Sequence, residues 1–228
     1  MTNSEISKYI RTLNQGSGTE TIFTRRISKN VELAKVWEKR PKPTDSIIGN
    51  FNPFTFFFIK SESSEYVGAV LDMGHDLHWY ISQKHRKKGY LVNALKSSIL
   101  PFLLSNRNEQ RISIDKHQIG EKNYENSKRV AELVGFKRLS AEIEGDKYSI
   151  LKEEFDWENE KLDEKNSLIG KKRIEELCKK AFYATKLFWL IKDELEMKYG
   201  DSSNLDCYVK ELRNYTWKIE DLMFEYEK

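Results

Sequence analysis

Apolar and polar residues alternate along the first part of the chain in short runs that predict strands, separated by runs with a helical period. The segments between them are turn-like, such as the Ser- and Glu-rich 61–65 between two apolar runs. Gly135 follows the last helical run, where a glycine commonly ends a helix. The expected strands are 21–27, 54–60, 66–73, 76–82, 111–117, 136–143 and 147–154, and the expected helices are 28–39, 91–104 and 125–134.

This order of elements, β-α-β-β-β-α-β-α-β-β, predicts the α+β or α/β class, with a mixed central sheet flanked by helices over residues 19–154. Residues 1–18 are polar and end in Gly-Ser-Gly, so we expect a weakly ordered arm or a short helix there. Residues 155–165 read as a charged connector, and 166–228 read as a separate helical region.

The helical region has apolar residues at every third or fourth position, in two runs separated by a polar break at 200–204. This spacing predicts an antiparallel helical hairpin packed along a heptad seam. Further apolar residues lie off the seam, so a second face is expected to dock on the first domain, on a second copy or on a protein partner. The expected seam is Ile174, Leu177, Ala181, Ala184, Phe188, Ile191 and Leu195 with Leu205, Tyr208, Leu212, Tyr215, Ile219, Leu222 and Tyr226, and the residues off it are Phe182, Leu187, Trp189 and Leu190.

Composition narrows the class of protein. Of the 228 residues, 39% are apolar, which is enough for a core, and the 33% that are charged nearly balance at a net charge of +3. Nucleic-acid binders carry a strongly basic face, so this balance argues against that class. No run is long enough for a membrane span and the start lacks a signal-peptide core, so we expect a cytoplasmic protein. Cys178 and Cys207 lie in helical patterns without metal-ligand company, and no metal site is predicted.

A basic turn at 85–90 stands where an apolar strand passes into a helix. The first N–H groups of a helix are unpaired and its dipole is positive there, which suits an anion. Gly89 lets the backbone approach a ligand without a Cβ in the way, and Arg86, Lys87 and Lys88 add positive charge. A solvated surface turn is the competing interpretation when the motif is considered alone.

A second motif further along the chain favours the phosphate-binding interpretation. The two motifs are Arg86-x-x-Gly89-x-Leu91 after a strand, and Asn126-Ser127 followed by Gly135-Phe136. Together they resemble the pyrophosphate loop and the later helix of the GNAT family of acetyl-CoA-dependent N-acetyltransferases. The sequence is most similar to the branch that contains ribosomal-protein N-terminal acetyltransferases. The resemblance covers residues 19–154 and agrees with the expected order of strands.

The resemblance implies that acetyl-CoA, as co-substrate, binds at the basic turn. Backbone N–H groups of residues 87–92 would then cradle the pyrophosphate, with the basic side chains of 86–88 close by. The edge of the preceding strand would pair with the pantetheine arm. The implied coenzyme-binding residues are Tyr80, Ile81, Ser82, Arg86, Lys87, Lys88, Gly89, Tyr90, Leu91, Val92, Asn123 and Asn126.

Acetyl transfer to an amine needs a base, a polarised carbonyl and a stabilised leaving thiolate. In the branch resembled here, an acidic residue on the strand before the phosphate loop often serves as base, and that position is Asp76. Strand alternation puts Asp76, His78 and Tyr80 on one face, so His78 is a second candidate. Ser127 is the candidate acid for the thiolate. The structural alternatives are a turn residue for Asp76, a hydrogen-bonded histidine for His78 and a helix cap for Ser127.

Three positions depart from the family pattern. Leu91 stands where the phosphate loop usually has Gly or Ala. Tyr124 stands where an asparagine is expected three residues before the serine, with Asn123 and Asn126 as neighbours. Ala131 occupies the position of the tyrosine that protonates the thiolate in many family members.

The sequence therefore predicts an acetyl-CoA-dependent N-acetyltransferase in which a primary amine, on a protein N-terminus or a small molecule, attacks the thioester directly. The alternative is a GNAT-fold protein without turnover that acts as an interaction protein through residues 166–228. A homodimer or a protein partner at those residues fits both. Substrate choice is expected in the loops 38–52 and 117–124, neither of which carries a diagnostic motif.

Overall fold

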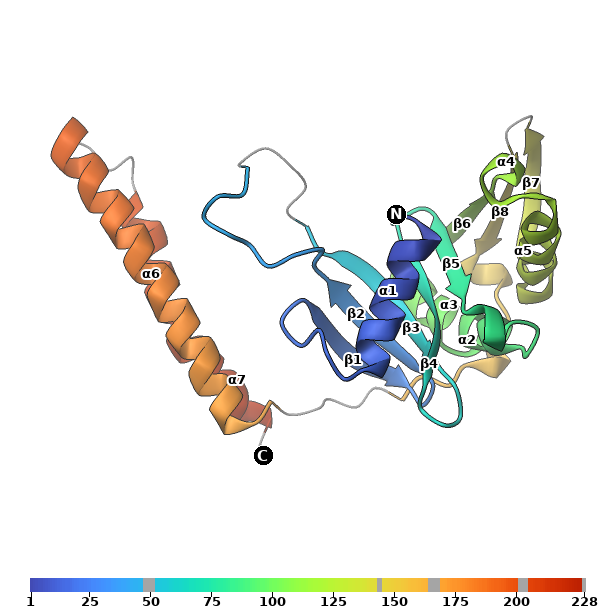
Figure 1. Cartoon of the computed structure of the whole chain (residues 1–228), viewed down its shortest axis with the longest axis horizontal. Coiled ribbons are helices and arrows are strands. Elements are labelled where there is room, and N and C mark those ends of the chain that lie inside the picture. The colour runs from blue at the N-terminus through green and yellow to red at the C-terminus, as the bar shows by residue number, and fades with distance from the viewer. Residues whose placement is uncertain (47–51, 143–144, 164–168, 201–204, 227–228) are drawn as a thin grey trace. The chain divides into compact units, whose positions relative to one another are not determined.

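The computed structural model describes residues 1–46, 52–142, 145–163, 169–200 and 205–226. Part of the expected substrate loop 38–52 and the tip of the last hairpin lie outside the described residues. The chain divides into two compact units, Met1–Asn166 and Ser167–Lys228 (Figure 1).

A five-stranded antiparallel sheet, with its strands in chain order, forms the larger part of the first unit (Figure 1). Both faces of this sheet are covered, which explains why β3 is an almost unbroken apolar run. Phe56 and Phe58 point into one core, and Phe57 and Ile59 point into the other. The strands are β1 (Ile22–Ser28), β2 (Val31–Val36), β3 (Phe54–Lys60), β4 (Tyr66–Asp72) and β5 (Leu77–Ile81).

Helices cover each face of this sheet. Helix α1 (Asn3–Asn14) begins at a capping box formed by Thr2 and Glu5, and it inserts Ile6 and Ile10 into the core on one face. Residues 1–18 therefore hold a packed helix and not a weakly ordered arm. The core on the other face is covered by one continuous helical segment, made of α2 (Tyr90–Ala94), a π-helical turn (Leu95–Ile99) and α3 (Leu100–Ser105).

A second, three-stranded antiparallel sheet completes the first unit. Its strands are β6 (Glu109–Ile114), β8 (Gly145–Leu151) and β7 (Lys137–Glu142), in that order across the sheet. Helix α5 (Glu121–Val134) ends at Gly135, whose φ of 102° is left-handed, as the sequence predicts. The other helical elements of this unit are α4 (Lys116–Ile119) and the 3₁₀ turns η1 (Gln83–His85), η3 (Lys152–Glu154) and η4 (Trp157–Asn159).

The α+β class, with sheets flanked by helices and a helical segment at the C-terminus, is confirmed, but the helix expected at 28–39 is wrong. That segment contains β2, which pairs with β1 on one side and β3 on the other. Val31 packs into one core while Ala34 and Val36 pack into the other. The same apolar residues fit a helical period, but only an extended chain buries them on both faces between two partner strands.

The expected connector continues the packing of the first unit. Phe155 is buried in the core. Further on, Lys161 N–H donates to the carbonyl of Ser97 at 2.8 Å, and Asp163 N–H donates to that of Ile27 at 2.9 Å. The Asp163 carboxylate also pairs with Arg26 at 2.7 Å.

The second unit is a pair of helices, α6 (Lys171–Tyr199) and α7 (Leu205–Tyr226). Lys192 near the end of α6 lies 3.4 Å from Asp206 at the start of α7, so the two helices run antiparallel. The seam between them agrees with the expected one in part. Among the described residues of this unit, Ile174 of the expected seam is buried, and so are Cys178, Thr185 and Val209, which were not expected there. Other expected seam residues are partly buried, namely Leu177, Ala181, Ala184, Leu195, Leu205, Leu212 and Ile219, whereas Phe188, Ile191, Tyr208, Tyr215 and Leu222 are about half exposed.

The two sheets of the first unit are joined at one end, along β5 and β6. Arg111 N–H donates to the carbonyl of His75 at 3.3 Å, and Ser113 N–H donates to Asp76 Oδ1 at 3.0 Å. Both contacts advance in the same direction along the two segments, so β5 and β6 run parallel there. Beyond these contacts the two strands belong to separate sheets.

Arg107 stabilises this joint. Its guanidinium donates to both carboxylate oxygens of Asp72, at 3.0 and 2.6 Å, and to the carbonyl of Gly74 at 2.8 Å. It also donates to Oε1 of the buried Gln110 at 2.7 Å, and Gln110 Nε2 donates in turn to the carbonyl of His75 at 3.1 Å. The end of the β4–β5 hairpin is therefore fixed to the start of β6.

We predict that Arg107→Ala lowers the free energy of unfolding by about 2 kcal/mol, because it leaves the nearly buried Asp72 carboxylate without its bidentate partner. The control is Arg111→Ala, which removes an exposed pair with Glu109 and should change the free energy of unfolding much less. Urea denaturation measures both. Equal losses in the two variants would contradict a special role for Arg107.

Candidate functional site

Away from the joint, β5 runs into a turn whose backbone suits an anion. Lys87 has a φ of 62° and Gly89 has a φ of 78°, both left-handed, and helix α2 begins directly afterwards. Asn93 N–H donates to the Gly89 carbonyl at 3.0 Å. For the amides of 87–92, no acceptor is found among the described residues outside the helix. A left-handed turn followed by unpaired helix amides is the geometry that binds phosphate groups.

The side chains of this turn leave its amides accessible. Arg86, Lys87, Lys88 and Gly89 are exposed. Leu91 is partly buried and packs against the core, so the larger residue at this family position does not fill the turn. The predicted phosphate-binding residues therefore lie together on one exposed turn with net positive charge.

Arg86 connects the end of β5 to α5. Its Nε donates to the carbonyl of Ile81 at 3.1 Å, and its Nη1 lies 3.4 Å from Asn123 Oδ1 on α5. The Ile81 carbonyl, on the edge expected to pair with the pantetheine arm, is thus already bonded to a side chain. Ser82 N–H is also engaged, with Val67 of β4 at 2.9 Å.

A second bridge crosses between β5 and α5. The indole Nε1–H of Trp79 donates to Ser127 Oγ at 3.4 Å. An indole can only donate, so Ser127 is the acceptor, and its own hydroxyl proton has no acceptor among the described hydrogen bonds. The sequence analysis missed Trp79, because strand alternation places it on the apolar face and nothing in its neighbours points to α5.

The predicted catalytic residues do not share one face. Leu77, Trp79 and Ile81 face the core under α2, where Trp79 reaches Ser127. Tyr80 packs on the α1 side. His78 lies on the α1 side as well, since its Nε2 is 3.0 Å from Asn3 Oδ1. Alternation along β5 is as predicted, but it separates His78 from Ser127.

Asp76 and His78 differ in their surroundings. Asp76 Oδ1 accepts the N–H groups of Leu77 at 2.8 Å and Ser113 at 3.0 Å, so this oxygen holds the joint between the sheets. Burial lowers the pKa of His78, the positive N-terminus lowers it further, and the charge of Asp76 partly opposes both effects. With Nε2 donating to Asn3, the neutral ring presents Nδ1 as a base.

Two tyrosines near the departures from the family motif are already engaged. Tyr124 O–H donates to Asp146 Oδ2 at 2.7 Å, and the buried Tyr148 hydroxyl lies 3.4 Å from the same oxygen. Arg138 pairs with the other oxygen of Asp146 at 2.5 Å. Burial raises the pKa of Tyr148 to about 12. Tyr124 therefore does not replace the family asparagine, while Ala131 is fully buried and offers no acid.

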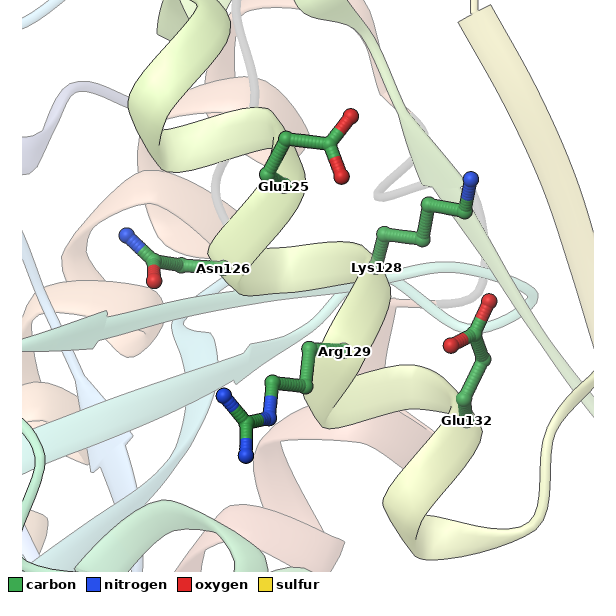
Figure 2. A pocket seen from close by; sticks show the side chains of 5 residues that line it. All are labelled: Glu125, Asn126, Lys128, Arg129 and Glu132. Atoms are coloured by element: carbon green, nitrogen blue, oxygen red, sulfur yellow. The ribbon is translucent and has the colours of Figure 1, made fainter.

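The outer side of α5 lines an open hollow of about 610 Å³. Figure 2 shows its lining, with Asn126 and Arg129 pointing to one side and Glu125, Lys128 and Glu132 to the other. Asn126 Nδ2 donates to the carbonyl of Lys122 at 2.6 Å. Of the two asparagines predicted to contact the coenzyme, Asn123 lies beside Arg86 and Asn126 lines this hollow.

In the described ranges, no group of three or more His, Cys, Asp or Glu side chains is arranged to hold a metal ion. No helix among the described residues combines the length and apolar character needed to cross a bilayer.

Comparison with known proteins adds little. No protein-family model matches the chain, and no curated protein matches it. A solved structure of mutant forms of the spermidine/spermine N-acetyltransferase SpeG from Vibrio cholerae is similar with a TM-score of 0.33 and 16% sequence identity, over 46% of this chain and 71% of that one. A likeness this distant does not say what the chain does, so its function is argued from the site.

We predict that His78 makes the protein less stable in acid. Because its pKa is lowered on folding, the unfolded chain takes up a proton before the folded one, and stability is lost as pH falls through the unfolded value near 6.5. Wild type should lose more free energy of unfolding between about pH 7.5 and about pH 5 than His78→Gln does. The exposed His117→Gln is the control and should follow wild type. Identical pH profiles for wild type and His78→Gln would contradict the burial argument.

Proposed function

We propose that the first unit is an acetyl-CoA-dependent N-acetyltransferase acting on a primary amine. The observation that carries the proposal is the basic turn at Gly89, at the end of β5 away from the joint, where no acceptor outside the helix is found among the described residues for the amides of 87–92. The diphosphate of coenzyme A has the charge that this turn suits, and a thioester arm could run along the β5 edge toward the joint. The motif resemblance to the GNAT family agrees with this placement.

In the proposed reaction, the amine nitrogen forms a bond to the acetyl carbonyl carbon, the carbon–sulfur bond breaks, and coenzyme A leaves as thiolate. The amine must first lose a proton, and His78 is the better base because Asp76 Oδ1 is occupied by two backbone amides. Ser127 is the proposed proton donor to the thiolate, because its oxygen accepts the Trp79 N–H and no acceptor for its own proton is found among the described hydrogen bonds. Since His78 and Ser127 lie on opposite faces of β5, both can act on one thioester only where it lies at the edge of that strand. Arg86 and the amides of 87–92 would hold the diphosphate.

The second candidate is a protein of similar fold that binds a partner without turnover. Two observations favour it: the Trp79–Ser127 and Arg86–Asn123 bridges already connect β5 and its turn to α5, and the buried Ala131 removes the usual acid. Binding of coenzyme A alone does not distinguish an acetyltransferase from a protein of similar fold without turnover. Release of free thiol from acetyl-CoA in the presence of an amine does, because only the enzyme transfers the acetyl group. The acceptor itself, a protein N-terminus or a small amine, is left to a screen of both classes.

We predict that Gly89→Ala weakens binding of desulfo-coenzyme A by about tenfold or more, because a Cβ at a left-handed residue distorts the turn that presents the amides. Gly74→Ala is a matched control, since Gly74 also has a positive φ of 84° and open space around it but lies at the joint. Isothermal titration measures both. Equal affinities for the two variants, or no binding by wild type at millimolar ligand, would contradict the coenzyme seat.

We predict that Ser127→Ala and His78→Gln each lower kcat for thiol release by about tenfold to 100-fold while leaving the affinity for desulfo-coenzyme A nearly unchanged. Asp76→Asn should instead lower stability, because it weakens the acceptor for two backbone amides at the joint. If Asp76→Asn abolishes turnover in a folded, ligand-binding protein while His78→Gln is fully active, the assignment of the base is wrong.

A further inference from the structure

The outer side of α6 is apolar although α7 does not cover it. Successive residues of a helix turn by about 100°, so Tyr183, Leu187 and Leu190 lie opposite the seam positions Cys178 and Thr185. Their exposed fractions are 64%, 42% and 66%, whereas Thr185 is 2% exposed. Within the second unit, a long helix with apolar residues on two opposite sides needs a cover on the second side.

Charged residues continue this face at both ends. Lys179 lies four residues before Tyr183, and Glu194 lies four residues after Leu190. We call Lys179, Tyr183, Leu187, Leu190 and Glu194 the outer stripe. Its middle is apolar, its N-terminal end is positive and its C-terminal end is negative, and all five side chains are exposed.

We propose that the outer stripe pairs with the outer stripe of a second copy of this chain, with the two α6 helices antiparallel about a two-fold axis between Lys186 and Leu187. Under that operation Tyr183 faces Leu190 of the second copy, and Lys179 faces Glu194 of the second copy. This inference is independent of the acetyltransferase proposal.

The charge pattern indicates a second copy as the occupant. Antiparallel pairing at this centre also sets Glu175 against Lys198 of the second copy. The charged residues four positions beyond each end of the stripe therefore also meet opposite charges. Parallel pairing would set Lys179 against Lys179 and Glu194 against Glu194, which repels. A self-complementary face of this kind is what a two-fold dimer requires.

Each ion pair would occur twice in the dimer, which makes charge reversal a sharp test. Lys179→Glu or Glu194→Lys alone turns two attractions into two repulsions and should raise the dissociation constant about tenfold. The double variant Lys179→Glu/Glu194→Lys restores opposite charges and should return close to wild type. The Lys179 and Glu194 side chains are both exposed, so we expect these variants to keep the helix pair folded, which circular dichroism verifies.

Sedimentation equilibrium of the full chain over a range of concentrations measures the association. The expected result is a wild-type dimer, a Leu190→Glu variant weakened at least about tenfold, and a Tyr215→Glu control on α7 that dimerises as wild type does. Three results would overturn the proposal: a monomeric wild type, a dimer lost in Tyr215→Glu but kept in Leu190→Glu, or a double charge reversal that is no tighter than the single ones.

Discussion

The joint between β5 and β6 is the constraint on which the arrangement of the first unit depends. Arg107 ties Asp72 to Gln110, and Asp76 accepts the Ser113 amide, so two sheets that share no ladder are held together at one end. Beyond that point β5 and β6 belong to separate sheets, and the basic turn follows the far end of β5. The same carboxylate that resemblance suggests as a base is thereby used to hold the fold. For this reason His78, and not Asp76, is the base in the proposed reaction.

Much of this could be predicted from the sequence, because local chemistry determines it. The positive φ of Gly89 and the helix that follows require only a glycine between a strand and an amphipathic run. The strand at Val31–Val36 could not be predicted, since its apolar spacing fits a helix and only the two neighbouring strands decide between them. Trp79 and Ser127 lie far apart in sequence, so their bridge depends on how α5 packs.

In the second unit, too, the sequence alone does not determine which residues pack together. Apolar residues on α6 and α7 satisfy more than one heptad register, and Cys178 and Thr185 are more deeply buried than the expected seam residues Leu177 and Ala184. The surplus apolar residues are then exposed at the surface. This surplus explains why an additional helical contact is expected. The order of charges along α6 is the reason for proposing a second copy of the chain as the partner.

Hydrogen–deuterium exchange at the amides of 87–92 tests the central claim most directly, because the proposed coenzyme seat consists of those N–H groups. We expect fast exchange at these amides in the free protein, and strong protection there when desulfo-coenzyme A is added, with little change in α6 and α7. Protection already present without ligand, or ligand-induced protection confined to other segments, would contradict it.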